Sequence, residues 1–146
     1  MWRRVCGLSV VAPLTRVRIT TAARLHATPR HYSTPGKVRV RVTTQDGTPI
    51  DFDAPAGVSL MHAIRDVAQL EMDGACDGCM QCSTCHVYLS EASFAKLGEP
   101  SEQEQDILDK ALDLAETSRL ACQITLTSTI DGLEVRLPKS VTNLLL

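Results

Sequence analysis

Residues 73 to 86 read Asp-Gly-Ala-Cys-Asp-Gly-Cys-Met-Gln-Cys-Ser-Thr-Cys-His, so that four cysteines recur at intervals of three. The four are Cys76, Cys79, Cys82 and Cys85. Thiolates packed this densely are soft ligands that suit a metal or a redox centre. Gly74 and Gly78 allow left-handed or close-approach backbone conformations, as a loop around a small inorganic group requires. The stretch therefore predicts a metal-binding loop, to which the distant Cys122 can add a fifth sulfur.

The cysteine spacing leaves four kinds of site open. Cys82-Ser-Thr-Cys85-His86 satisfies the C-x-x-C-H motif of c-type haem attachment. The run from Cys76 begins like a [4Fe–4S] pattern, but it continues as C-x2-C-H where that pattern has C-x3-C-P. Two C-x-x-C pairs can form a structural zinc site, although such pairs usually lie further apart. The favoured alternative is C-x5-C-x2-C-x36-C, using Cys76, Cys82, Cys85 and Cys122, which has one residue more in its first gap than plant-type [2Fe–2S] spacing.

Several segments around these cysteines resemble the adrenodoxin-type, or mitochondrial, [2Fe–2S] ferredoxins. They are Gly74-Ala75-Cys76, Cys82-Ser83-Thr84-Cys85-His86, Glu116-Thr117-Ser118-Arg119-Leu120, Cys122-Gln123-Ile124 and Val135-Arg136-Leu137-Pro138. The match extends over about residues 37–138. The resemblance implies that Cys76, Cys82, Cys85 and Cys122 ligate the two irons and that Cys79 does not. We expect Cys79 to be a free buried thiol, and His86 to link the loop to the body of the domain without ligating iron.

The resemblance also implies an α+β domain of the β-grasp ferredoxin fold. In that fold, one helix packs on a mixed sheet, the cluster lies near the surface and an acidic helix docks partner proteins. By position, the best contact candidates are Glu102, Asp106 and Asp109. Glu104 and Arg119 stand where the family has an internal ion pair.

The N-terminal segment is rich in arginine and free of acidic residues. Residues 1–35 contain six arginines and no Asp or Glu, a composition typical of a mitochondrial transit peptide. A secretory signal fits less well, because more arginines follow the apolar stretch from Val5 to Leu14, and ten residues cannot span a bilayer. We expect cleavage near Arg30 to Ser33, giving a transit peptide over residues 1–32 and a ferredoxin domain over residues 33–146.

Removal of this segment makes the protein strongly acidic. The full chain has a net charge of −2, and the mature part keeps nine basic and seventeen acidic residues, a net charge near −8. Such a chain repels nucleic acid and anionic membranes and favours basic protein partners. Matrix thiols also stay reduced, which argues against a disulfide framework.

Hydrophobic patterning predicts the elements of one modest aliphatic core. Val38, Val40 and Val42 alternate with arginines, which indicates a half-buried strand. A turn at residues 45–48 and a strand with Ile50 and Phe52 complete a hairpin. A helix capped by Ser59 carries an apolar face of Leu60, Ile64, Val67 and Ala68, and His62 on it is expected to be an ordinary boundary histidine.

The second half of the chain predicts a strand, an acidic helix and two further strands. The first strand covers residues 86–89. A helix opens at Ser101, which forms a capping-box pattern with Glu104. Its apolar stripe, Ile107, Leu108, Ala111, Leu112 and Leu114, is expected to hold it to the body. Two strands, over residues 123–127 and 133–137, flank a turn at Asp131-Gly132.

The combined features predict a monomeric electron carrier of the mitochondrial matrix rather than an enzyme, with no transmembrane span. The resemblance implies that it accepts electrons from an NADPH-dependent flavoprotein ferredoxin reductase. The acceptor would be iron–sulfur cluster assembly, haem A synthesis or mitochondrial cytochromes P450, and Glu116-Thr117-Ser118-Arg119 favours assembly. The alternatives are a Cys-rich zinc-binding interaction module and a c-type haem carrier using Cys82, Cys85 and His86. The haem alternative leaves Cys76 and Cys122 unexplained.

Overall fold

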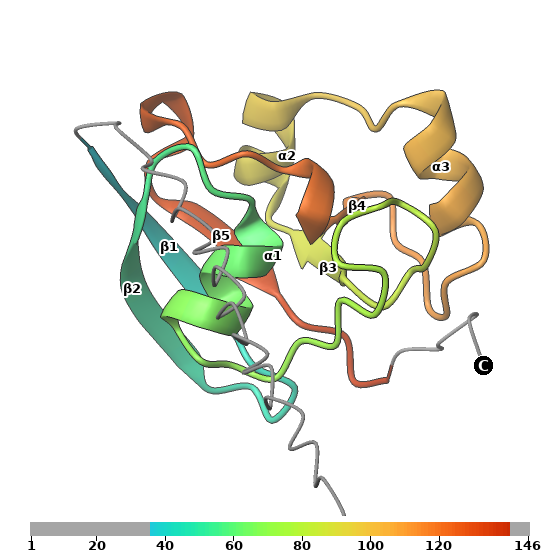
Figure 1. Ribbon diagram of the computed structural model, residues 1–146, viewed down its shortest axis with the longest axis horizontal. Helices are drawn as coiled ribbons and strands as arrows, with labels where there is room; N and C mark the ends of the chain where they lie inside the picture. Colours follow the sequence, from blue (N-terminus) through green and yellow to red (C-terminus); the bar gives the residue numbers. More distant parts are fainter. Residues whose placement is uncertain (1–35, 141–146) are drawn as a thin grey trace, which may run out of the picture. The chain divides into compact units, whose positions relative to one another are not determined.

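The computed structural model describes residues 36–140, and within them the strands form one mixed sheet in the order β2-β1-β5-β3-β4 (Figure 1). The strands are β1 (Lys37–Thr43), β2 (Pro49–Pro55), β3 (His86–Leu89), β4 (Ser118–Leu120) and β5 (Leu133–Arg136). The helices are α1 (Leu60–His62), η1 (Ala63–Val67), α2 (Glu91–Leu97), α3 (Glu102–Leu108), η2 (Ala121–Gln123) and η3 (Ser128–Ile130). The expected transit peptide and the tail after residue 140 lie outside the described residues.

The N-terminal hairpin confirms the alternation in the sequence. Val38, Val40 and Val42 of β1 are fully buried, and β1 pairs antiparallel with β2 across the turn at Gly47. β1 pairs parallel with β5, while β3 pairs antiparallel with both β4 and β5. Arg41 on the outer face bonds Asp51 of β2 at 2.7 Å and Glu134 of β5 at 3.3 Å. The mixed sheet expected of a β-grasp fold is therefore present.

The helix after the hairpin differs from the predicted α-helix. Ser59 caps it as expected, accepting a hydrogen bond from the backbone N–H of His62 at 3.3 Å. Only Leu60–His62 of this segment is α-helical, and Ala63–Val67 is a π-helix. In the π-helix the N–H of Ala68 donates to the C=O of Ala63 at 3.0 Å. The wider turn rotates Val67 out of the predicted apolar face, and this side chain is 45% exposed.

The second half of the chain corrects three predictions. The strand expected over residues 123–127 is instead η2 and an isolated bridge between Ser59 and Thr125, while β4 lies just before them. Helix α2 was not predicted. The acidic helix ends at Leu108, so that Leu112 and Leu114, at 48% and 43% exposed, do not hold it to the body. The chain turns there, and Asp113 has a positive φ of 53°.

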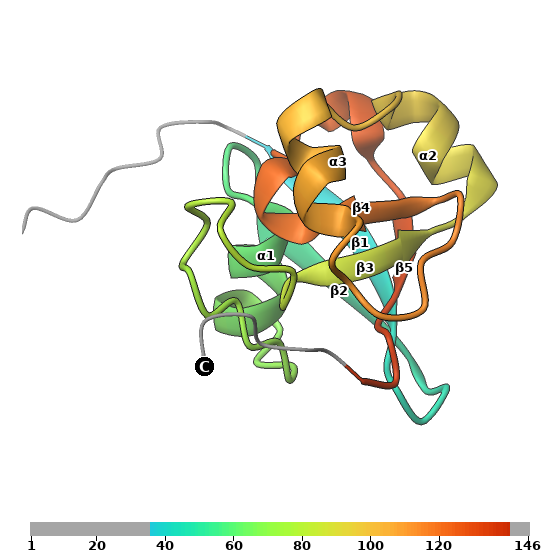
Figure 2. The same cartoon turned by 90° about the vertical axis from the view of Figure 1, so that its right-hand side faces the viewer.

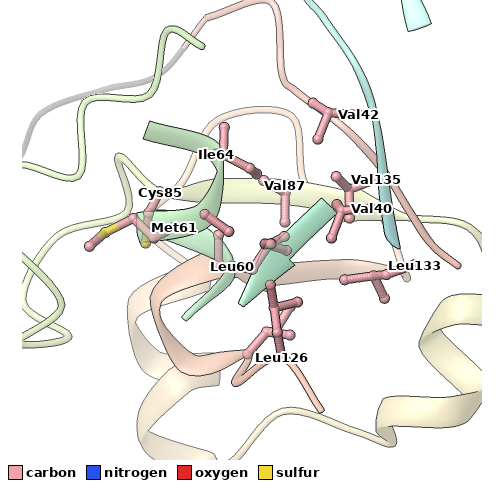
Figure 3. Close-up of a cluster of buried hydrophobic side chains, with 14 of the residues drawn as sticks. Val40, Val42, Leu60, Met61, Ile64, Cys85, Val87, Leu126, Leu133 and Val135 are labelled. Carbon is pink, nitrogen blue, oxygen red and sulfur yellow. The ribbon is translucent and has the colours of Figure 1, made fainter. Parts of the chain in front are cut away.

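The core is aliphatic and lies between the sheet and α1–η1. Val40, Val135 and Leu60 are among its buried members, and Figure 3 shows Cys85 and Met61 with them. The chain that carries the predicted loop leaves this core at η1 and returns to it at β3. Among the described residues, no helix has the length and apolar character needed to cross a bilayer.

Candidate metal centre

The predicted metal-binding loop is an irregular segment between η1 and β3 that bends back on itself. Gly74, Asp77, Gly78 and Met80 all have positive φ, between 49° and 92°. Two tight turns stabilise the bends: the N–H of Asp77 donates to the C=O of Gly74 at 2.8 Å, and that of Cys79 to the C=O of Cys76 at 3.1 Å. Successive left-handed residues turn backbone N–H groups toward a common concave side, as a site for an anionic group requires.

The four predicted ligand thiols lie near one another. The thiol of Cys76 interacts with that of Cys82, and the thiol of Cys85 interacts most strongly with that of Cys122 and more weakly with that of Cys82. Within residues 36–140, no three His, Cys, Asp or Glu side chains converge as ligands of a single metal ion would. A structural zinc site needs four ligands around one ion.

Cys122 reaches the loop because η2 lies beside it (Figure 1). The N–H of Ala121 donates to the C=O of Cys85 at 2.9 Å, which continues the pairing of β3 with β4. On the other side, a methyl group added at Gly78 would lie 3.8 Å from Cβ of Cys122. A residue 37 positions after Cys85 in sequence is thereby fixed against the loop.

The electrostatics of the thiols favour a bound cation. The interaction with the Cys85 thiol, offset in part by burial, lowers the pKa of Cys122 to about 7. The same interaction and burial raise the pKa of Cys85. Burial opposes ionisation of Cys76, yet N–H groups of Gln81, Cys82 and Gly78 and the Cys82 thiol outweigh it and lower the pKa of Cys76. Two thiolates this close repel each other unless positive charge lies between them, and metal coordination deprotonates such thiols outright.

Polar groups lie within hydrogen-bond distance of the thiols, as is typical of the surroundings of an iron–sulfur cluster. Thr84 Oγ1 lies 3.2 Å from Cys82 Sγ and accepts the N–H of Ala75 at 2.9 Å. Gln123 Nε2 donates to Cys122 Sγ at 3.2 Å. Ser83 Oγ, between two of the proposed ligands in sequence, is the single buried side-chain N or O atom in the described residues without a partner. A free hydroxyl donor beside the ligands suits sulfur acceptors, which tune the cluster by accepting hydrogen bonds.

The prediction that Cys79 is a buried thiol was wrong, because its side chain is exposed. The turn that begins at Cys76 carries Cys79 to the outside of the loop. Cys79 is therefore accessible to solvent while Cys82 and Cys85 are buried. The spacing alone could not separate these positions, because all four cysteines recur at the same interval, and only the resemblance set Cys79 apart.

His86 connects the end of the loop to the body of the domain, as expected. Its Nε2 lies 2.8 Å from Ser118 Oγ, and its ring packs edge-on against Tyr88 with 4.8 Å between the ring centroids. Burial lowers the pKa of His86, so the ring is neutral at neutral pH. The resemblance implied this link but did not identify Ser118 as the partner of His86.

The helix beneath the loop fixes its position from the other side. Arg65 of η1 donates to Asp77 at 3.1 Å and to Asp66 at 2.8 Å, and neither contact was predicted. His62 Nε2 lies 3.6 Å from the same Asp77 carboxylate and is half-buried, as expected of a boundary histidine. A Cβ at Gly74 would lie 2.8 Å from Sδ of the fully buried Met61. The loop therefore needs a glycine at this position.

Gly74→Ala is expected to lower the free energy of unfolding by about 2 to 5 kcal/mol. The left-handed conformation contributes about 1–2 kcal/mol and the collision with Met61 about 1–3 kcal/mol. Gly47→Ala is the matched control, because Gly47 has φ of 87° and nothing within 4 Å of its added methyl group. Denaturant unfolding measures both variants. Equal losses would show that Met61 moves aside at no cost.

The acidic residues predicted to contact partners divide into two groups. Glu102 and Asp106 are exposed on α3, and Asp109 is exposed at its C-cap. Glu104 points inward and bonds Arg119 through two nitrogens, at 2.9 and 3.0 Å, with the side chains 2% and 9% exposed. Ser101 caps α3 by accepting the N–H of Glu104 at 3.2 Å, but the Glu104 carboxylate is engaged with Arg119, so only half of the predicted capping box forms.

Comparison with known proteins places this site among iron–sulfur proteins. A family model described as a 2Fe-2S iron-sulfur cluster binding domain matches residues 43–127. The 2Fe-2S ferredoxin of Rickettsia felis is 44% identical over 109 residues, which cover 75% of this chain and 96% of the relative. The mitochondrial Ferredoxin-2 of Danio rerio is 41% identical over 106 residues, covering 73% of this chain and 54% of the relative.

Solved structures with the same fold agree. A ferredoxin from Rhodopseudomonas palustris HaA2 has a TM-score of 0.68 and 34% identity, with 71% of this chain and 99% of that chain covered. A chain of the covalent putidaredoxin reductase–putidaredoxin complex has a TM-score of 0.62 and 35% identity, with 70% and 99% covered. The mixed sheet and the cysteine loop therefore occur together in proteins of this type.

Proposed function

The chain belongs to the [2Fe–2S] ferredoxin family, and from this premise we propose that it is an adrenodoxin-type one-electron carrier of the mitochondrial matrix. Proteins of this family bind a [2Fe–2S] cluster and transfer electrons rather than catalyse a reaction of their own. The cofactor is thus the cluster, and not the c-type haem or zinc that the cysteine spacing also allowed. The direction of electron flow, the partners and the location are the proposal.

The ligands are Cys76 and Cys82 to one iron and Cys85 and Cys122 to the other. The observation that supports this assignment is that η2 holds Cys122 against the loop, beside Cys85, while the strongest interaction of the Cys76 thiol with another thiol is with that of Cys82. Cys79 is left out because it is exposed. When bound, the cluster supplies one reversible electron. The protein supplies four thiolates, whose negative charge lowers the reduction potential, and the donors Thr84 and Gln123, which counter it.

The electron donor is an NADPH-dependent flavoprotein reductase that docks on the acidic residues of α3. The solved covalent complex of putidaredoxin with its reductase supports a reductase partner for a protein of this fold. Glu102 and Asp106 are exposed on α3, and Asp109 is exposed at its C-cap. Glu104 of the same helix accepts the N–H of Leu120 at 2.8 Å, and Leu120 lies two residues before Cys122. Carboxylates on this helix steer a basic partner toward the cluster region.

Reversing two of these charges tests the docking proposal. Asp106→Lys combined with Asp109→Lys is expected to reduce the kcat/KM of reductase-dependent cytochrome c reduction about tenfold at low salt, because attraction becomes repulsion. The loss should shrink as salt screens the charges. Glu91→Lys, a reversal at an exposed acid of α2, is the control and should have a small effect. An unaltered rate in the double variant would show that these acidic residues face solvent and do not contribute to reductase docking.

The acceptor is the iron–sulfur cluster assembly machinery. The segment Glu116-Thr117-Ser118-Arg119 supports this branch over haem A synthesis and mitochondrial cytochromes P450. The reduced protein should therefore be reoxidised faster by purified iron–sulfur assembly proteins than by a mitochondrial P450. A preference for the P450 would overturn the choice of acceptor while leaving the electron carrier intact.

The matrix location rests on the arginine-rich, acid-free residues 1–32, together with the mitochondrial relative of Danio rerio. The full chain should be imported by isolated mitochondria and shortened near residues 30–33. A chain starting at residue 33 should remain outside while still assembling its cluster. Import of that shortened chain would mean that the targeting information lies elsewhere.

A further inference from the structure

A groove of about 540 Å³ lies between the corner that joins α2 to α3 and the segment of residues 114–118. Figure 2 shows α2, α3 and the chain that returns toward β4 on the same side of the molecule. The groove does not involve the cysteine loop, and the outward-facing Asp109 is not among its lining residues. It is therefore a feature separate from the metal centre, and it extends beyond the charged face of α3.

Part of the lining of this groove is apolar. Phe94, Pro100 and Leu108 line it from the α2 and α3 side, and Leu114 lines it from the opposite wall. Leu114 is 43% exposed, although it lies in a depression that a side chain from outside could fill. The folded monomer therefore covers only part of this aliphatic side chain, which lies in the same groove as a half-buried aromatic ring and a proline.

The rim of the groove is uniformly acidic. Glu99, Glu102, Asp106 and Glu116 are exposed around it, and its lining includes no Lys, Arg or His. Arg119 lies beneath, but Glu104 already neutralises it at 2.9 Å. The net field at the mouth of the groove is therefore negative, and a cationic group is its natural complement.

Both walls are fixed before any partner binds. Arg119 Nη1 donates to the C=O of Gly98 at 2.8 Å and so anchors the α2–α3 corner. Opposite, the N–H of Ala115 donates to Ser118 Oγ at 2.9 Å, and Tyr88 Oη donates to the C=O of Asp113 at 2.6 Å. A pre-formed groove avoids the ordering cost that a flexible surface incurs on binding.

We propose that this groove docks a partner protein segment in which an apolar side chain is flanked by Arg or Lys residues. The apolar side chain enters between Phe94 and Leu114, and the cations reach the acidic rim. A second copy of this domain would bring the same acidic face, and nucleic acid or anionic lipid would be repelled. The inference rests on the proposed docking of basic partners, and it adds an apolar anchor that gives specificity where surface charge alone gives little.

Two peptides test the groove on the holoprotein without any reductase. Ac-Gly-Arg-Leu-Arg-Gly-NH2 has the proposed pattern, and a second peptide with serine in place of leucine has the same charge. We expect the leucine peptide to bind about tenfold more tightly by calorimetry, because it buries one aliphatic side chain. Adding salt should weaken both peptides similarly and leave the ratio unchanged, because the leucine contribution is not electrostatic.

Matched variants locate the effect. Leu114→Ser should abolish the preference for leucine, whereas Leu112→Ser should keep it, because Leu112 is equally exposed but does not line the groove. Leu114→Met should also keep the preference for the leucine peptide, because methionine restores an apolar side chain in the groove. This variant therefore distinguishes the loss of an apolar contact from a folding defect. Glu99→Gln combined with Glu116→Gln should weaken both peptides, and Glu91→Gln should not.

Equal binding of the two peptides would overturn the apolar anchor. So would absence of binding by either peptide, or equal effects of Leu114→Ser and Leu112→Ser. Because the assay transfers no electron, these outcomes leave the proposed electron carrier untouched. Loss of reductase coupling alone would likewise leave the groove proposal standing.

Discussion

Replacing any one of the four proposed ligands with serine is expected to remove the normal [2Fe–2S] cluster. The ligands are Cys76, Cys82, Cys85 and Cys122. In the proposed assignment, Cys76 and Cys82 bind one iron, and Cys85 and Cys122 bind the other. The loss of any one thiolate therefore leaves its iron with a single protein sulfur. Iron and acid-labile sulfide analysis, together with the visible spectrum, measures the loss.

Cys79→Ser is the matched control and should retain the wild-type iron content and spectrum. Its thiol is the exposed one among the four in the loop, and Gly78 and Met80 on either side turn the backbone with φ of 92° and 54°. A Cys79→Ser protein that cannot hold iron, beside a Cys82→Ser protein that can, would contradict the ligand assignment.

Glu104→Ala is expected to lower the free energy of unfolding by about 3–5 kcal/mol, which is a large part of a typical domain's about 5–15 kcal/mol. The variant leaves Arg119 buried without its counter-ion and leaves the N–H of Leu120 without its acceptor at 2.8 Å. Both groups are too deep for water to replace the carboxylate readily. Denaturant unfolding followed by the cluster absorbance measures the change.

Glu102→Ala is the control on the same helix, because its carboxylate is exposed, and its effect should be within about 0.5 kcal/mol. If Glu104→Ala behaved like Glu102→Ala, Glu104 would not be the residue that fixes α3 against β4. Glu104 would then return to the group of partner-contacting acids.

Patterns of period two and capping residues made much of the fold predictable. Val38, Val40 and Val42 fixed the face of β1, and Ser59 and Ser101 marked two helix starts at the observed positions. The α2 helix was missed although Ser90 caps it, accepting the N–H of Ser93 at 3.3 Å. The signal was weak because α2 is short and packs only Phe94 and Leu97 against the core beside the buried Ser93.

The errors in the helices have a common physical origin in tertiary contacts. The π-turn at Ala63–Val67 places Arg65 near Asp77 and leaves Val67 outside, which no local periodicity encodes. The acidic helix stops early because the chain must return to pair β4 with β3. Leu112 and Leu114 therefore lie in a turn rather than on a helix face.

The candidate site was predictable in its chemistry and less so in its geometry. The spacing of the cysteines left four kinds of site open, and only the resemblance selected the [2Fe–2S] set. That Cys79 is exposed and that the other thiols lie near one another depend on the left-handed turns at Asp77 and Gly78, together with the position of η2. The orphaned hydroxyl of Ser83 depends on burial alone and had no signal in the sequence.

The most direct test of the central claim is a visible and EPR spectrum of the purified protein before and after dithionite, with iron and sulfide counted on the same sample. A [2Fe–2S] cluster on the four proposed ligands predicts two irons and two sulfides per chain, broad absorption bands that bleach, and a rhombic signal of one unpaired electron on reduction. A colourless protein with one zinc ion would contradict the account, as would a sharp Soret band from haem on Cys82 and Cys85.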